Sequence, residues 1–103
     1  MTKPGTEING IVSQEDWVPT LVAVAGEPKV KEKLLTGFPA AGKTFKVHLD
    51  GYDVTDYLAG KAEDPRIEFF YWTDEGNLAA MRYDRWKVLF LEQRAVGFKV
   101  SLL

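Results

Sequence analysis

The sequence contains no cysteine and only one histidine, His48, and these absences remove several classes of site. Without cysteine there can be no disulfide framework, no thiolate metal site and no cysteine nucleophile. A single histidine with no second ligand nearby in the sequence favours a surface or packing residue over a metal ligand. We therefore expect neither a metal nor a cofactor.

A strong excess of one charge is also lacking. Thirteen lysines and arginines stand against fifteen acidic residues, interspersed along the chain, for a formal net charge of -2. No apolar run approaches the roughly 18 residues that cross a bilayer. The first ten residues, MTKPGTEING, are polar and do not resemble a secretory signal. We expect no nucleic-acid or membrane partner, and a cytoplasmic location by default.

Aromatic residues are plentiful instead, and they concentrate near the end of the chain. Of the 103 residues, 46% are hydrophobic and 13% aromatic, which is typical of a folded domain. Seven of the thirteen aromatic residues fall between Arg66 and Arg94. This stretch predicts three antiparallel strands separated by a turn with Gly76 and a reversal at Asp84-Arg85. The predicted strands are Ile67 to Thr73, Leu78 to Tyr83 and Trp86 to Leu91.

The preceding half of the chain predicts helices. The first lies in Ser13 to Ala25, and Gly26 closes it. Ser13 with Asp16 resembles a capping box, but a start at Asp16 puts Pro19 in the first turn, where proline is tolerated. We prefer Asp16 as the principal cap. The residues expected to face the core are Trp17, Val18, Leu21 and Val24.

Further short elements complete the prediction of an α+β fold, with a small antiparallel sheet of about four strands and two to three helices on one face. We expect residues 1–12 to form a flexible lead or an edge strand at Glu7 to Val12, and residues 13–103 to form a single domain. The remaining predicted elements are a helix from Lys29 to Thr36, a strand from Phe45 to Leu49, a helix from Val54 to Ala59 and a last strand from Phe98 to Leu103.

The segment Gly37 to Thr44, GFPAAGKT, matches the P-loop pattern G-x-x-x-x-G-K-[ST] letter for letter. A P-loop requires a strand before the glycine-rich loop and a helix after it, so that backbone N–H groups cradle phosphate. Here a predicted helix precedes the segment and a predicted strand follows it. The order favours a helix cap followed by a loop over a nucleotide site.

Two small groups of polar residues are candidate sites. Asp50, Asp53 and Asp56 lack the spacing of an EF-hand loop, so Asp53 is better explained as a helix cap and Asp50 as a turn residue. The basic residues that cluster near the second reversal offer a possible anion site, against the simpler alternative of a solvated sheet edge. They are Arg82, Arg85 and Lys87.

Three stretches, in order, resemble the C-terminal subdomain of bacterial type I arylsulfatases, of the alkaline-phosphatase-like superfamily. Ser13 to Gly26, SQEDWVPTLVAVAG, is similar to the family's S-H-x-D-x-x-P-T-L-L-x-x-A-G segment. Val47 to Lys61 resembles D-G-x-x-L-x-x-x-L-x-G. Arg66 to Phe90 is similar to R-x-E-F-F-Y…L-x-A-x-R-x-x-x-W-K-V. The resemblance runs from about Thr6 to about Arg94, and AVGFKVSLL does not continue it.

The resemblance implies a sulfuric ester hydrolase whose chemistry lies in an earlier part of the chain. Its C/S-x-P-x-R motif supplies a formylglycine nucleophile, and separate Asp, Asn and His residues bind a divalent cation. Neither feature occurs here, and the family's histidine after the serine is Gln14. No catalytic residue is therefore carried over. We expect a non-catalytic remnant, whether a truncated gene, a mobile gene fragment or a cloned piece.

The strands of Arg66 to Arg94 are apolar on both faces, and such a sheet needs cover on both. Two short helices can cover only one, which leaves an apolar patch and favours a homodimer or higher homo-oligomer. The alternatives are a small module that binds an anionic, sulfated ligand, or a fragment of a sulfatase active when complete. The expected self-association residues are Phe70, Trp72, Trp86, Val88 and Phe90.

Overall fold

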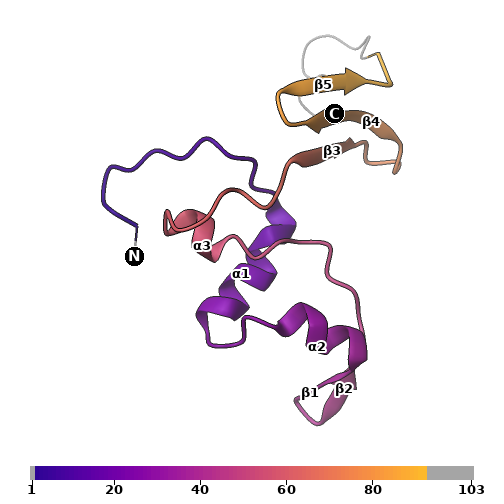
Figure 1. Cartoon of the computed structure of the whole chain (residues 1–103). Helices are drawn as coiled ribbons and strands as arrows, with labels where there is room; N and C mark the ends of the chain where they lie inside the picture. The colour runs from indigo at the N-terminus through magenta and orange to yellow at the C-terminus, as the bar shows by residue number, and fades with distance from the viewer. Residues whose placement is uncertain (1, 93–103) are drawn as a thin grey trace. The chain divides into compact units, whose positions relative to one another are not determined.

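The computed structural model describes residues 2–92 and has an α+β fold (Figure 1). The described residues form three α-helices, a two-stranded antiparallel sheet and a three-stranded antiparallel sheet. The α+β class predicted from the sequence is therefore confirmed. Contacts between residues divide the chain into two compact units, Met1–Arg66 and Ile67–Leu103.

All the helices found among residues 2–92 lie in the first unit. A 3₁₀ turn, η1 (Gln14–Asp16), leads directly into α1 (Trp17–Val24), so that Pro19 lies in the first turn, as predicted. The other two are α2 (Val30–Thr36) and α3 (Thr55–Leu58). Residues 2–12 form neither helix nor strand, so the alternative of an edge strand at Glu7 to Val12 is not adopted.

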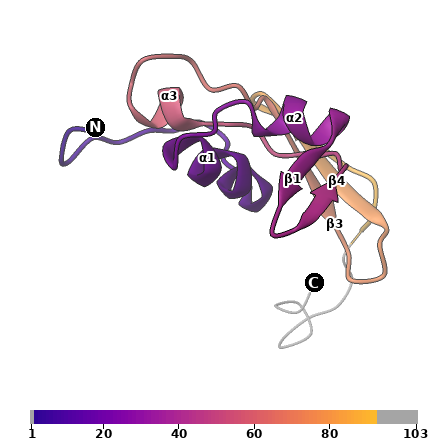
Figure 2. The same ribbon diagram turned by 90° about the horizontal axis from the view of Figure 1, so that it is seen from below.

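The P-loop-like segment forms a β-hairpin. Gly37 ends α2 with φ 122°, and β1 (Phe38–Ala40) then pairs with β2 (Lys43–Phe45). Ala41 and Gly42 connect the two strands with φ values of 50° and 75°. In Figure 2 this hairpin follows α2. Since the glycine-rich loop joins two strands, it has no helix N-terminus at which to hold phosphate.

The strand predicted from Phe45 to Leu49 is wrong beyond its first residue. Regular pairing ends at Phe45, and residues 46–50 have no regular structure. The backbone N–H of Val47 instead donates to the carbonyl oxygen of Leu34, 3.1 Å away. The alternating pattern therefore describes an extended segment that is bonded to α2 rather than to another strand.

The core of this unit is formed by the side of α1 that the sequence did not predict. Val54, Pro19 and Thr20 are buried, and the Thr20 hydroxyl oxygen accepts a 3.0 Å hydrogen bond from the Val54 backbone N–H. The prediction that the apolar residues of α1 face the core is wrong. All four of the residues expected to face the core are exposed: Trp17, Val18, Leu21 and Val24.

Gly51 allows the segment before α3 to approach η1 closely. A Cβ atom at Gly51 would overlap the carbonyl group of Glu15. We expect Gly51→Ala to destabilise the first unit by about 1–3 kcal/mol, because backbone atoms would have to move apart. Urea unfolding followed by circular dichroism measures this. Gly60→Ala is the control, because a Cβ atom at Gly60 meets no atom within 4 Å and only the positive φ of 72° is unfavourable. We expect it to lower the free energy of unfolding by only about 1 kcal/mol. Equal losses for the two substitutions would contradict the close approach at Gly51.

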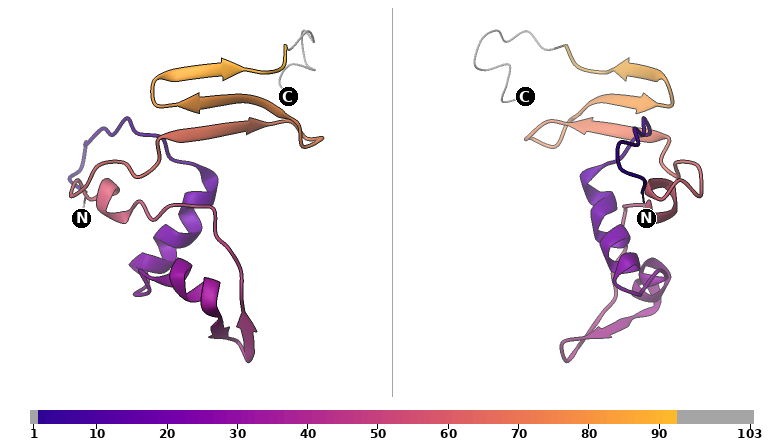
Figure 3. Two further views of the ribbon diagram at one scale, coloured as in Figure 1. Left: turned by 45° about the vertical axis from the view of Figure 1, so that its right-hand side comes forward. Right: turned by 90° about the vertical axis from the view of Figure 1, so that its left-hand side faces the viewer.

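The second unit contains a three-stranded antiparallel sheet in the order β3-β4-β5 (Figure 3). The strands are β3 (Glu68–Trp72), β4 (Leu78–Tyr83) and β5 (Trp86–Leu89), and each lies within one predicted strand. Gly76 has φ 81° in the first turn, and Asp84 has φ 52° in the reversal. The five strands of the described residues are thus divided between two sheets, this three-stranded sheet and the β1–β2 hairpin. The strand expected from Phe98 to Leu103 lies outside the described residues.

Candidate functional site

The most enclosed polar site in the described residues is an ion pair between Asp16 and Arg66. Arg66 Nε donates to Asp16 Oδ2 at 2.8 Å, and one terminal nitrogen donates to Oδ1 at 2.6 Å. The aspartate is fully buried, and the arginine is 4% exposed. This is a two-bond arrangement in which the planar guanidinium matches the carboxylate.

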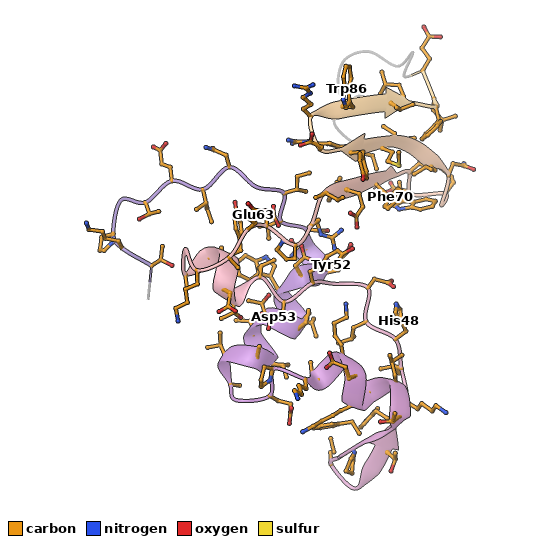
Figure 4. All side chains as sticks on the ribbon, viewed as in Figure 1. His48, Tyr52, Asp53, Glu63, Phe70 and Trp86 are labelled. Carbon is orange, nitrogen blue, oxygen red and sulfur yellow. The ribbon has the colours of Figure 1, made fainter. Side chains whose placement is uncertain are left out.

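Backbone groups complete the site around Asp16. Its Oδ2 accepts from the N–H of Ser13 and its Oδ1 from the N–H of Tyr52, both at 2.8 Å. The Arg66 guanidinium also lies 4.8 Å from the centre of the Tyr52 ring and 3.0 Å from a Glu15 carboxylate oxygen. Figure 4 shows Tyr52 beside α1.

These contacts give the Asp16 carboxylate a structural role. Each oxygen already accepts from the guanidinium and from one backbone N–H, so neither is open to a metal ion or a substrate proton. Burial alone would raise the pKa of Asp16. The Arg66 guanidinium and the N–H groups of Tyr52 and Ser13 outweigh burial and hold the pKa below its ordinary value of 3.8. The site joins three parts of the chain, and both Asp16 oxygens are occupied by hydrogen bonds within the fold.

The lowered pKa of Asp16 predicts a loss of stability in acid. A carboxyl group with a folded-state pKa below its unfolded value stabilises the fold fully above the unfolded value, and this contribution disappears as the pH falls through the folded value. We therefore expect the urea midpoint of the first unit to fall below about pH 4. Glu15→Gln should keep this acid dependence, whereas a midpoint that stays constant down to pH 2 would contradict the role given to Asp16.

The sequence did not reveal this pair. Asp16 was preferred as the principal cap of the first helix, but its side chain makes no cap hydrogen bond at α1. It accepts from the N–H of Ser13 instead, which is the contact of the capping box that the sequence offered as the alternative. Arg66 was given no role. The two residues are fifty positions apart, so no local pattern connects them. Each does, however, belong to a different one of the three stretches that resemble arylsulfatases, and Tyr52 belongs to the remaining one.

One face of the β3-β4-β5 sheet carries large apolar side chains. Strand register places Phe70, Met81 and Val88 in one row, and Tyr83 and Trp86 in the next row on the same face. The alternation of β3 puts Trp72 there as well. We call these six residues the aromatic face. The five largest exposures on it are 43% for Phe70, 47% for Val88, 52% for Tyr83, 60% for Trp72 and 67% for Trp86.

Four of the five expected self-association residues thus share one exposed face. The fifth, Phe90, follows β5 and is also exposed. In Figure 4 the labels of Phe70 and Trp86 lie on the first and last strands of the sheet, so the face extends across it. Of the described residues in β3-β4-β5, only Ala80 is buried.

The three candidate anion-binding residues are divided by the sheet. Arg82 and Lys87 lie directly opposite each other on β4 and β5, on the face away from Trp86. The Lys87 ammonium lies 4.5 Å from the centre of the Tyr71 ring, on that same face. Arg85 lies in the reversal, with its guanidinium 5.5 Å from the Trp86 ring centre. The geometry therefore brings Arg82 and Lys87 together and leaves Arg85 apart.

No family model, curated protein or solved structure matches this chain. The resemblance to arylsulfatases accordingly stays a prediction from the sequence.

The remaining acidic residues and His48 form no metal site within residues 2–92. His48 Nε2 lies 3.2 Å from an Asp50 carboxylate oxygen, and both side chains are exposed. Asp53 accepts hydrogen bonds from the backbone N–H and the hydroxyl of Thr55, the first residue of α3. The predicted cap role of Asp53 is therefore wrong in its position: the N-cap of α3 is Val54, and Asp53 precedes it in a turn that bonds to Thr55. No helix within the described part of the chain is long and apolar enough to cross a bilayer.

Proposed function

We infer that the chain is a non-catalytic α+β module, of the kind found at the C-terminus of arylsulfatases, that associates with a second copy of itself. The observation that carries this proposal is the aromatic face, which exposes five large apolar side chains on one side of a three-stranded sheet. Contiguous exposed apolar surface of this kind is typical of interaction sites.

The size of the aromatic face supports a dimer. Aromatic side chains bury about 150–250 Å² each, so the exposed fractions on this face correspond to roughly 500 Å² per copy. A stable interface buries about 800 Å² per partner, and a polar rim would supply the rest. Two copies that meet through the same face form a closed, two-fold assembly.

The absence of catalysis in the proposal is supported by the Asp16–Arg66 site. Its carboxylate oxygens are all occupied by hydrogen bonds within the fold. The sequence also lacks the C/S-x-P-x-R motif that supplies the nucleophile in the resembling family. Because residues from all three family-like stretches meet at this buried pair, the pair supports a structural role for these stretches within such a module.

A second candidate is that the chain is part of a larger sulfuric ester hydrolase. This is favoured by a second apolar surface, in the first unit, where Trp17, Leu21 and Val24 lie exposed along α1 at helical spacing. Such a stripe is suited to packing against a further body of protein. Hydrolysis of 4-nitrophenyl sulfate by the purified chain would contradict the non-catalytic proposal, and no turnover is expected.

Light scattering coupled to size exclusion tests the self-association. We expect a mass of twice the 11.6 kDa chain at micromolar concentration, with dissociation on dilution. A monomer at every concentration up to the millimolar range would overturn the proposal.

A further inference from the structure

The face of the sheet opposite the aromatic face contains an open hollow of about 550 Å³. This volume lies within the range of small-molecule sites, about 300–1,000 Å³. Ala79 and the buried Ala80 have short side chains, and larger residues surround them. The lining residues are Tyr71, Thr73, Ala79, Ala80, Leu89, Leu91 and Glu92.

The register of the strands places a pair of cations at one end of this hollow. Tyr71, Ala80 and Leu89 form one row across the sheet, and Phe69, Arg82 and Lys87 form the next row on the same face. Two residues along a strand span about 7 Å, so the cations lie one such step from the apolar row. The Lys87 ammonium also lies 4.5 Å from the centre of the ring of Tyr71, which lines the hollow.

The cation pair is costly unless an anion lies near it. Like charges directly opposite each other on neighbouring strands repel and destabilise the pairing. Arg82 Nε donates to the carbonyl oxygen of Asp84, a neutral acceptor that leaves its positive charge in place. An anionic group beside Arg82 and Lys87 would relieve this repulsion and gain charge-assisted hydrogen bonds.

We propose that this hollow binds a small organic anion with a flat aromatic body. The aromatic body lies over Ala80 between Tyr71 and Leu89, and the anionic group is held by Lys87 and Arg82. The site is independent of the proposed self-association, because it uses the face of the sheet that the dimer leaves free. It differs from a simple anion site because the apolar body is required as well as the charge.

The probe for the test is naphthalene-2-sulfonate, titrated into isotope-labelled chain and followed by NMR. We expect nuclear Overhauser effects from the naphthalene protons to the methyl groups of Ala80 and Leu89. Inorganic sulfate, which has the charge but no apolar body, should not bind at the same concentration. Contacts to the methyl groups of Met81 and Val88 instead would place the ligand on the aromatic face and overturn the proposal, as would no binding.

Two variants test the cations. Lys87→Met keeps an unbranched side chain of similar length and should weaken naphthalene-2-sulfonate about fivefold. It should leave the binding of neutral 2-naphthylmethanol unchanged, which shows that the hollow still forms. If Lys87→Met fails to fold, the sulfonate affinity of Arg82→Met tests the role of the cation pair independently. Equal affinity of both variants and the original chain for the sulfonate would overturn the role of the charges. Val88→Lys, on the other face, should bind the sulfonate normally, so this test can fail without the self-association failing.

Discussion

Replacing Arg66 by methionine is expected to destabilise the first unit by about 3–5 kcal/mol, the largest effect of any single substitution considered. The variant leaves the fully buried Asp16 carboxylate without its counter-ion, although the N–H groups of Ser13 and Tyr52 remain. Small domains have total stabilities of about 5–15 kcal/mol, so this loss is a large fraction of the total. Circular dichroism during urea unfolding measures the loss.

Glu15→Gln is the matched control for this prediction. Glu15 also contacts Arg66, at 3.0 Å, but its side chain is 51% exposed, so solvent weakens the interaction. We expect the control to cost less than about 1 kcal/mol. Equal losses for Arg66→Met and Glu15→Gln would mean that the buried pair is not what holds the three stretches together.

Val88→Lys is expected to convert the dimer into a monomer. Val88 lies in the central row of the aromatic face, and a two-fold interface would bury the new charge twice without a partner. We expect the dissociation constant to rise by at least about a hundredfold, measured by sedimentation equilibrium. The fold should remain intact, because the residue is exposed in the single chain.

Leu89→Lys provides the control, since Leu89 adjoins Val88 on β5 and faces the opposite side of the sheet. It is more exposed than Val88 and should leave the dimer unchanged. If Leu89→Lys dissociated the dimer and Val88→Lys did not, the hollow side of the sheet would be the interface.

The sheet was predictable because its signals are local. Aromatic and β-branched residues mark the strands, and Gly76 supplies the positive φ that its turn requires. The two-residue reversal at Asp84-Arg85 follows from the length of the gap between strands. Alternation then indicated which side chains share a face, so four of the five residues expected to self-associate were found together.

The buried side of α1 was not predictable from its own pattern. Trp17, Leu21 and Val24 form an apolar stripe that predicts a core-facing side. In the structure Thr20 is buried instead, because its hydroxyl serves the backbone N–H of Val54, thirty-four residues later. A hydrogen bond between distant segments leaves no trace in local periodicity.

The hairpin at Gly37 to Thr44 shows how a motif can match without its context. Ala41 and Gly42 take positive φ values, which suits a two-residue turn between antiparallel strands. The sequence order of helix before and extended segment after already argued against a P-loop. The tight turn itself was missed, because a non-glycine residue with positive φ is uncommon.

Isotope-filtered NMR on an equal mixture of labelled and unlabelled chains tests the association through the aromatic face. This measurement reports only contacts between different copies. We predict nuclear Overhauser effects between copies at Phe70, Trp86 and Val88. Contacts between copies that involve Ala80 and Leu89 but none of those three residues would contradict it.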